Sequence, residues 1–354
     1  MLGVSMPVPP LRVTLRDIAR AAGCHYSTVS LALRDHPRLS PATRERVQGV
    51  ARRLGYVADP LLASLSSYRS ARRPAPFRST LAWISNYPTV DGWRQAEVFH
   101  QYFLGAGERA QALGFKLDVF WLRERGMTPA RASQILRSRN VTGLLIAPNP
   151  EPGAAIALDW PSFSAVALGY TLASPSLHLV STHQYRSIKL AISRLLERGY
   201  RRIGLVMPEL SDTRVDHNWL AGYLVMQQAI PPAERVPHLF PPAWDEAAFR
   251  IWVRRHRPDA IVTKNAEVLP ALHRLGLAVP AEVGVAFLTL ATVDGELSGI
   301  DENPREVGAA AADFVAGMIH RNERGAPAMP QRVLIDGTWI DGTTVRPAPA
   351  AVRA

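Results

Sequence analysis

An N-terminal segment constrains the fold most, because its pattern is typical of two short helices joined by one tight turn. Thr14 followed by Asp17 has the form of a capping box and predicts a helix over about residues 15–22. Gly23 can turn the chain at positive φ, so a second helix is expected from around Tyr26. The buried side of the second helix would consist of Val29, Ala32 and Leu33. The outward side chains would be Tyr26, Ser27, Thr28, Ser30 and Leu31.

A third helix is predicted by Ser40 at its N-cap and Pro41 at its first position, and it should end at Gly55. The three helices together would form a compact bundle. The alternative is a generic helical domain whose charged face is only solvated.

Positive charge is concentrated in the same part of the chain. Residues 1–73 contain twelve arginines against four acidic residues, which gives a net charge of +8 out of +11 for the whole chain. This distribution is expected for a nucleic-acid-binding module attached to a nearly neutral body. A membrane-surface role would require a longer amphipathic helix with bulky aromatic residues, and the sequence has none.

Several separated motifs in this segment resemble the DNA-binding headpiece of the lac repressor/galactose repressor family. The matching stretches, in order over residues 13–69, are "VTLRDIARAAG", "STVSLAL", "HPRLSPATRERV" and "LGYVADPLLASL". The resemblance implies that the second helix enters the major groove of DNA. The base contacts that it implies are Tyr26, Ser27 and Leu31. The phosphate contacts that it implies are Thr28, Ser30, Arg38 and Ser40.

Two positions depart from the family pattern. Leu31 stands where many members carry an arginine that contacts guanine in a bidentate manner. Leucine can make only apolar contacts, for instance with a thymine methyl group, so the operator should differ from those of arginine-bearing relatives. His25 stands where a small N-cap residue is common, and it could cap the helix, contact a phosphate or have no role.

A short leucine-rich helix is expected after the bundle, beginning at Asp59 as N-cap and Pro60. It is too short to be stable alone in water. By resemblance it is the hinge helix, which orders when two copies pack together in the minor groove of DNA. Leu65 would insert between base pairs, and Leu61 and Leu62 would form or underlie the contact between the copies. The alternative is a linker helix packed on the body.

The rest of the chain has the pattern of an α/β fold, with short apolar runs alternating with longer amphipathic stretches. Strands are expected at residues 80–85, 116–122, 143–148, 165–169, 202–208, 260–264 and 283–290. Two similar helix-to-strand joints, at Gly114 and Gly199, indicate two lobes of like construction. Motifs such as "RLLERGYRRIGLV" and "PDAIVTKN" resemble the effector-binding and dimerisation region of the same family. The implied fold is similar to that of periplasmic sugar-binding proteins, with a ligand cleft between the lobes.

The ligand positions of the family are only partly kept. Trp219 stands where many members hold a sugar-binding arginine, Thr289 stands at a common aspartate, and Ala266 replaces another aspartate. A hydroxyl-rich sugar therefore cannot be assumed as the effector. The candidate effector-binding residues are Tyr87, Gln184, Asn218, Trp219, Lys264, Asn265, Thr289 and Glu302, with Tyr87, Trp219 and also Trp93 as stacking faces. A plain surface or core position is an alternative for each of them, and the response to an effector could be lost altogether.

Motifs of enzymes and cofactor sites are absent from the sequence or misplaced in it. The stretch "GAGERA" at residues 105–110 fits a loose dinucleotide-binding fingerprint, but it lies inside a helix expected from near Trp93. Its glycines more plainly indicate close helix packing. No P-loop, nucleophile elbow or zinc-protease motif occurs. The single cysteine, Cys24, excludes an intramolecular disulfide and a cysteine-cluster metal site. We expect no cofactor and no enzymatic activity.

No run approaches the roughly 18 apolar residues of a membrane-spanning helix, and the first residues lack the features of an export signal. The expected location is the cytoplasm, on the nucleoid. The expected organisation is a DNA-binding headpiece (1–57), hinge helix and linker (58–78), a two-lobed effector-binding and dimerisation domain (79–347) and a tail (348–354) without a leucine heptad.

The sequence thus predicts a transcription regulator, most simply a repressor. It would bind a pseudopalindromic operator as a homodimer and respond to a small molecule, a carbohydrate among the candidates. The alternatives are a solute-binding receptor of a transport system and an architectural DNA-binding protein without an effector.

Overall fold

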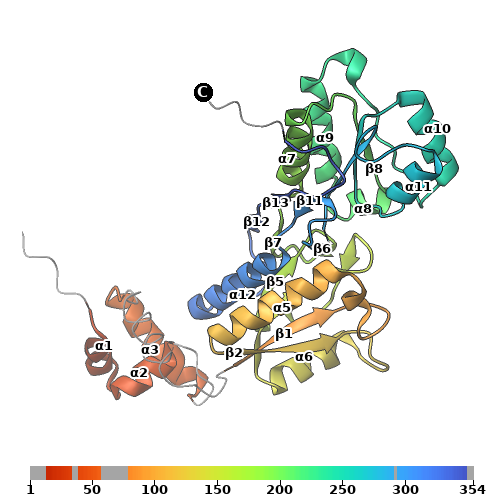
Figure 1. The fold of residues 1–354 in the computed structure, drawn as a ribbon. Coiled ribbons are helices and arrows are strands. Elements are labelled where there is room, and N and C mark those ends of the chain that lie inside the picture. The colour runs from red at the N-terminus through yellow and green to blue at the C-terminus, as the bar shows by residue number, and fades with distance from the viewer. Residues whose placement is uncertain (1–12, 34–38, 57–78, 291–292, 349–354) are drawn as a thin grey trace, which may run out of the picture. The chain divides into compact units, whose positions relative to one another are not determined.

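The computed structural model describes residues 13–33, 39–56, 79–290 and 293–348, and the chain divides into two units between Pro76 and Phe77 (Figure 1). The first unit contains the helices α1 (Leu15–Ala22), α2 (Tyr26–Ala32) and α3 (Pro41–Arg53). The expected hinge residues Leu61, Leu62 and Leu65 lie outside the described residues, as does Arg38.

Local signals set the ends of the three headpiece helices as the sequence predicts. The Thr14 side chain accepts a hydrogen bond from the Asp17 backbone, and the Asp17 carboxylate accepts one from the Thr14 backbone N–H. Gly23 ends α1 with φ at +61°, in the left-handed region that glycine adopts without strain. Ser40 caps α3 by accepting from the Thr43 backbone N–H. These caps confirm the predicted boundaries of α1 and α3.

The headpiece has a core of its own, made of small and branched apolar side chains from all three helices. Its fully buried members are Ile18, Ala19, Ala22, Val29, Ala32, Val47, Val50 and Ala51. Two polar side chains of α3 fasten it to the other helices, since Arg46 donates to the Ala22 carbonyl at 2.7 Å and Gln48 donates to the Ala32 carbonyl at 3.0 Å. One arginine of this basic segment therefore has a structural role.

The second unit consists of two lobes, each built on one sheet (Figure 1). The first lobe comprises residues 79–183 and 303–335. Its strands are all parallel, in the order β12 (Arg332–Ile335), β7 (His178–Thr182), β5 (Ser164–Leu168), β3 (Val141–Ile146), β1 (Ser79–Ser85) and β2 (Phe115–Trp121). Helices α5 (Glu97–Ala112) and α12 (Pro304–Arg321) cover one face of this sheet, and α6 (Pro129–Ser138) covers the other.

The second lobe comprises residues 184–302 and 338–348. Its sheet has the order β13 (Thr338–Ile340), β11 (Ser298–Asp301), β10 (Gly284–Phe287), β9 (Ala260–Thr263) and β8 (Ile203–Val206), with only β13 antiparallel to its neighbour. Helices α7 (Gln184–Glu197) and α9 (Asn218–Ala229) cover one face, and α10 (Glu246–His256) and α11 (Val268–Arg274) cover the other. The short α8 (Glu209–Thr213) follows β8.

The two lobes repeat the same strand order, as the two similar joints in the sequence predict. In the first lobe β2 lies beyond β1, on the side away from β3. In the second lobe Val206 of β8 forms a parallel bridge to Leu239, which puts the Leu239 segment in the corresponding place beyond β8. The two lobes are therefore of like construction, although the joints are not equivalent positions within them, because Gly114 precedes β2 and Gly199 precedes β8, the counterpart of β1.

The sequence did not predict β4 (Ala154–Ala155) and β6 (Leu172–Ser174), which form a separate two-stranded parallel sheet, nor four strands of the two main sheets, namely β7, β11, β12 and β13. They are short, and β12 and β13 pair with strands far away along the chain, β12 with β7 and β13 with β11. The chain crosses between the lobes after β7, after β11 and after β12, so these last four strands flank the crossings. An alternating pattern of a few residues carries little information about such long-range pairing.

The glycines of "GAGERA" lie inside α5, as the sequence predicts. A Cβ atom on Gly105 would collide with the backbone of Arg305, and one on Gly308 would collide with the backbone of Tyr102. The α5 and α12 backbones therefore approach each other closely through a pair of facing glycines. This arrangement confirms packing as the role of Gly105.

Candidate DNA-binding surface and candidate effector cleft

The outward face of α2 carries the side chains expected to contact bases. Tyr26 is 54% exposed and Ser27 is exposed, while Leu31 is half-buried. The core uses Val29 and Ala32 on the opposite side of the helix. Tyr26 and Ser27 therefore take no part in the core of the bundle, and part of the apolar surface of Leu31 is accessible to solvent.

His25 has a defined structural role at the start of α2. Its ring nitrogen Nδ1 accepts a hydrogen bond from the Ser27 backbone N–H at 3.4 Å and lies 2.8 Å from the Ser27 hydroxyl. Its ring also contacts the ring of Tyr26, with the centroids 4.7 Å apart. Of the three roles considered for His25, capping of the helix is the one that the structure shows.

The side chains expected to contact phosphates are only partly described. Thr28 and Ser30 are half-buried on α2, and Ser40 is exposed at the N-terminus of α3, where its hydroxyl lies 2.9 Å from that of Thr43. The first turn of α3 also presents backbone N–H groups, which favour anions at a helix N-terminus. Arg38 lies outside the described residues.

The candidate effector residues come from both lobes and share one structural position. Each lies at or just beyond the carboxyl end of a parallel strand, except Asn218 and Trp219, which begin α9. Tyr87 follows β1 and Gln184 follows β7, whereas Lys264, Thr289 and Glu302 follow β9, β10 and β11. Ligands of open parallel sheets bind outside this edge of the sheet. The structure thus gathers these residues at the carboxyl ends of the strands in the two sheets. We call these the edges of the two lobes, and the chain crosses between the lobes there.

Lys264, Thr289 and Glu302 form the electrostatic centre of the second-lobe edge. The carboxylate of Glu302 is buried, and its Oε2 accepts a hydrogen bond from the Thr289 hydroxyl at 2.8 Å. Burial raises the pKa of Glu302, opposed by the Lys264 ammonium and by the bond from Thr289. The protein atoms around the Lys264 ammonium group exclude water from it, and this loss of hydration lowers its pKa. Part of the Lys264 side chain is nevertheless exposed to solvent.

Trp219 is not the open stacking face that the sequence suggested. Its side chain is 1% exposed and belongs to the core of the second lobe, and the Lys264 ammonium lies 5.1 Å from the centroid of its ring. The indole Nε1–H has no hydrogen-bond partner among the described residues. Trp93 is likewise buried, against Trp83 and Phe103, so it is a core residue of the first lobe.

Three other candidates differ in whether their side-chain polar atoms already form hydrogen bonds within the protein. The Asn218 amide donates to the Val215 carbonyl at 2.6 Å, and the Asn265 side chain accepts from the Glu267 backbone at 3.0 Å, so both stabilise turns. Gln184 is buried and donates to Ser181 at 3.3 Å, but its Oε1 atom has no partner in the described part of the chain.

Arg214 joins the two edges and was missed by the sequence analysis. It lies between α8 and α9 of the second lobe, and its guanidinium donates to the Pro150 carbonyl of the first lobe. The same group lies 5.6 Å from the centroid of the Phe99 ring and hydrogen-bonds to Tyr87. Burial raises the pKa of Tyr87, and Arg214 opposes this shift. No periodicity or motif around Arg214 marks it, because its role depends on a contact with the other lobe.

Backbone strain is stored directly beside Arg214. Asp216 and His217 both have φ at +56°, a left-handed conformation that costs about 1–3 kcal/mol for a residue other than glycine. The buried Asp212 holds this turn, since its carboxylate accepts from the Leu220 backbone at 3.0 Å and contacts His217 Nδ1 at 2.9 Å. Strain of this kind tends to occur at functional sites, and here it positions the start of α9.

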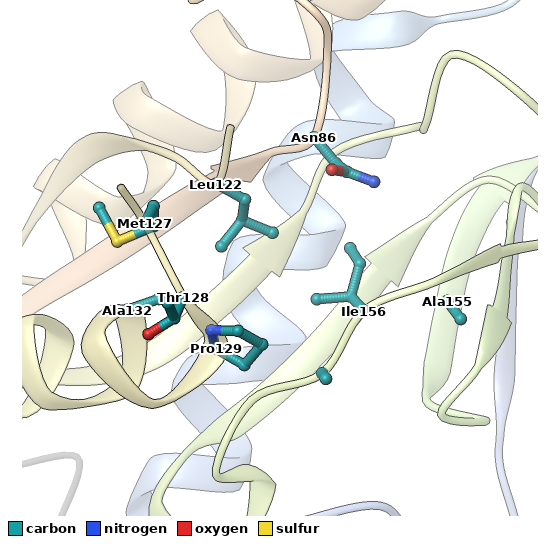
Figure 2. A pocket seen from close by; sticks show the side chains of 9 residues that line it. Asn86, Leu122, Met127, Thr128, Pro129, Ala132, Ala155 and Ile156 are labelled. Carbon is teal, nitrogen blue, oxygen red and sulfur yellow. The ribbon is translucent and has the colours of Figure 1, made fainter. Parts of the chain in front are cut away.

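A small pocket lies at the edge of the first lobe, among Asn86, Leu122, Met127, Pro129 and Ile156 (Figure 2). Its lining combines apolar side chains with the polar residues Asn86 and Thr128. Asn86 donates to Asn149 at 3.3 Å and accepts from Arg123 at 3.2 Å, so its polar atoms are occupied. None of the predicted effector residues lines this pocket.

Two further searches covered the described part of the chain. None of its helices combines the length and apolarity needed to cross a membrane. Within the same residues, no group of three or more histidine, cysteine, aspartate or glutamate side chains is placed to hold a metal ion.

Two family models match the chain. The model described as bacterial regulatory proteins, lacI family, matches residues 14–59, and the model of a periplasmic binding protein-like domain matches residues 192–345. Both matches fall where the resemblance in the sequence placed a headpiece and a two-lobed body.

Curated relatives extend over most of the chain. The lactose operon repressor of Escherichia coli (strain K12) is 24% identical over 283 residues, which cover 77% of this chain and 74% of the relative. The HTH-type transcriptional regulator MalR of Staphylococcus xylosus is 21% identical over 325 residues, covering 87% and 91% of the two chains.

Solved structures show the same fold. A complex of the transcriptional regulator CelR with cellobiose matches with a TM-score of 0.53 and 20% identity, over 94% of this chain and all of that one. The lac repressor dimer bound to operator and the anti-inducer ONPF matches with a TM-score of 0.53 and 18% identity, over 95% and 100%.

Proposed function

The chain belongs to the lacI family of bacterial regulatory proteins, and on this premise we infer that it is a transcription regulator that binds operator DNA through its headpiece. It is a regulator and not an enzyme. We expect it to act as a repressor, and we expect it to work in the cytoplasm, on the nucleoid.

The observation that carries this function is the free outer face of α2. The bundle buries Val29 and Ala32 and leaves Tyr26 and Ser27 exposed on a helix whose ends are capped. A helix with exposed polar side chains outside the core, within the arginine-rich part of the chain, fits a recognition helix in the major groove. Tyr26, Ser27 and Leu31 are therefore proposed to contact bases.

The positioning contacts are proposed at Thr28, Ser30, Arg38 and Ser40, which would bind phosphates and set the register of the headpiece on the duplex. A homodimer would place two headpieces on a pseudopalindromic operator. The hinge residues Leu61, Leu62 and Leu65 would meet at its centre, in the minor groove. The proposed boundaries are 1–57 for the headpiece, 58–78 for hinge and linker, 79–347 for the two-lobed domain and 348–354 for the tail.

The two-lobed domain is proposed to bind a small-molecule effector between the lobes. The residues proposed for it are Tyr87, Gln184, Asn218, Trp219, Lys264, Asn265, Thr289 and Glu302. Arg214 supports this placement, because it already connects the two edges that a ligand would bridge. The complex of CelR with cellobiose is consistent with a ligand of small size in this fold. Closure around a ligand would shift the population of states and so alter DNA binding.

The experiment that tests the proposal is selection of bound duplexes from a random DNA library by the purified full-length protein. We expect an enriched palindrome whose half-sites are about one helical turn apart. The variant Tyr26→Ala should select a changed or degenerate half-site, whereas Gln228→Ala, exposed on α9, should select the original one. Salt-sensitive binding without any enriched sequence, with and without metabolite extracts, would contradict a sequence-specific regulator.

A further inference from the structure

Lys264 is a cation without a counter-ion in contact. It donates no hydrogen bond and forms no close ion pair with any residue that the structure describes, and its ammonium group lies over the ring of Trp219. The charge of Glu302 attracts Lys264, but one carboxylate oxygen of Glu302 accepts a hydrogen bond from Thr289. The Lys264 side chain is partly exposed while its ammonium group has lost much of its hydration, so it is placed to bind an anion from solution.

A second cation approaches from the same lobe. Arg214 is half-buried, and within the described residues its hydrogen bonds go to neutral groups, the Pro150 carbonyl and the Tyr87 phenol. Arg214 lies just before α9, and Lys264 lies over the ring of Trp219 in the first turn of α9, so both cations stand at the start of this helix. The charge of Arg214 contributes to the lowered pKa of Lys264. Two like charges without anionic contacts destabilise each other, and an anion between them removes that cost.

Unpartnered hydrogen-bond donors lie beside both cations. Two buried donors have no partner within the described residues, namely Nε1 of Trp219, whose ring lies under Lys264, and Nδ2 of Asn149, the residue before the Pro150 that Arg214 contacts. Buried donors are nearly always paired with protein, water or ligand. A ligand rich in acceptor oxygens would satisfy both donors and both cations.

We propose that the effector is a small organic anion, a carboxylate or a phosphate monoester, whose charged group binds at Lys264 and Arg214. This inference rests on the proposed function, since it names the class of molecule that the same cleft takes. The Oε1 atom of Gln184, which has no partner among the described residues, is an acceptor and suits a hydroxyl group elsewhere on the ligand. The lost arginine and aspartates of the sugar-binding pattern are thus replaced by cations at other positions.

The test compares matched neutral and anionic probes on the full-length protein. Thermal unfolding is followed with glucose, glucuronate and glucose 6-phosphate, and with a panel of other small carboxylates, phosphate monoesters and their neutral parents. At least one anion should raise the unfolding temperature of the wild type where its neutral parent does not. The two anionic arms distinguish a carboxylate effector from a phosphate one. Stabilisation by neutral sugars alone, or by no anion in the panel, would overturn the proposal.

Variants assign the effect to the site. Lys264→Gln should weaken binding of the stabilising anion roughly ten- to a hundredfold by titration calorimetry, and Lys264→Arg should retain much of it. The matched control is Lys189→Gln, because Lys189 also lies over an aromatic ring, that of Tyr185 at 5.2 Å, but within α7. Equal loss in both glutamine variants would contradict a specific role of Lys264. Operator binding without any added anion is measured for the wild type and for the control Lys189→Gln, which should match it, so failure of the anion proposal is separable from failure of the regulator proposal.

Discussion

His25 begins α2 with an imidazole nitrogen in the place where serine, threonine or aspartate usually supplies an oxygen. The ring also packs against Tyr26, a proposed base contact, so one residue both caps the proposed recognition helix and contacts its first side chain. Leu31, near the other end of α2, has the opposite character, because its side chain offers no hydrogen bond to DNA. Base selection by this headpiece should therefore depend on Tyr26 and Ser27 for polar contacts and on Leu31 for thymine methyl groups.

Replacing His25 tests the cap. His25→Ala removes the acceptor for the Ser27 N–H and should destabilise α2 by about 1 kcal/mol, which corresponds to a roughly fivefold increase in amide exchange. His25→Ser keeps an acceptor and should restore protection. Hydrogen–deuterium exchange of the full-length protein, read on peptides covering residues 26–32, measures the difference. Unchanged exchange in His25→Ala would mean that the cap contributes nothing to the helix.

At the scale of elements, α5 and α12 show how sequence spacing becomes close contact. Tyr102, Ala106 and Ala110 recur every four residues on α5, and Val307, Ala311 and Val315 do the same on α12, so each helix turns one stripe toward the sheet and its neighbour. Gly105 and Gly308 then allow the backbones to meet. This packing connects α12, which follows the crossing after β11, to the helix that precedes β2.

Adding one methyl group at this contact should be costly. Gly308→Ala would force its Cβ against the Tyr102 backbone, and overpacking of this kind destabilises by about 1–3 kcal/mol or more. We expect a lower unfolding temperature and a lower denaturant midpoint for the two-lobed domain. The matched control is Gly107→Ala on α5, whose new Cβ would meet only Leu117 Cδ2 at 3.9 Å. It should be neutral or stabilising by up to about 1 kcal/mol, because alanine favours helix. Equal destabilisation by both changes would attribute the effect to helix propensity or local strain and not to the contact.

The elements that the sequence predicted correctly are those with local signals. The capping box at Thr14, the turn at Gly23 and the cap at Ser40 each act within one helical turn, and they fixed the boundaries of α1 and α3. Strands β12 and β13 have no such local signal, since their partners β7 and β11 lie elsewhere in the chain. For the same reason Lys264 could be predicted as a site residue, because it follows a predicted strand. Arg214 could not, because its role depends on a contact with the opposite lobe. Solvent exposure was also out of reach, so a buried Trp219 could not be told from an exposed one.

At the scale of the whole molecule, the chain places its charge and its ligand chemistry in different units. The headpiece carries most of the net positive charge, and the predicted effector residues lie where the three crossings connect the lobes. A ligand that binds both edges acts on these crossings directly, because Gln184 and Glu302 stand at two of them. The effect on DNA requires a connecting segment, and residues 58–78 with the proposed hinge fill that place in the sequence.

The hinge predicts a difference between two substitutions in that N-terminal part, both at positions outside the described residues. Leu65→Ala should remove the wedge that kinks the duplex and lower the ratio of specific to non-specific affinity by roughly tenfold or more. Arg38→Ala should instead weaken binding to every sequence and reduce the slope of log K against log salt by about one, since it removes one phosphate contact. Titrations of the selected operator and of a scrambled duplex at several salt concentrations separate the two effects. An unchanged ratio in Leu65→Ala would remove the hinge from the account of DNA binding, and a changed base preference in Arg38→Ala would show that this residue reads sequence.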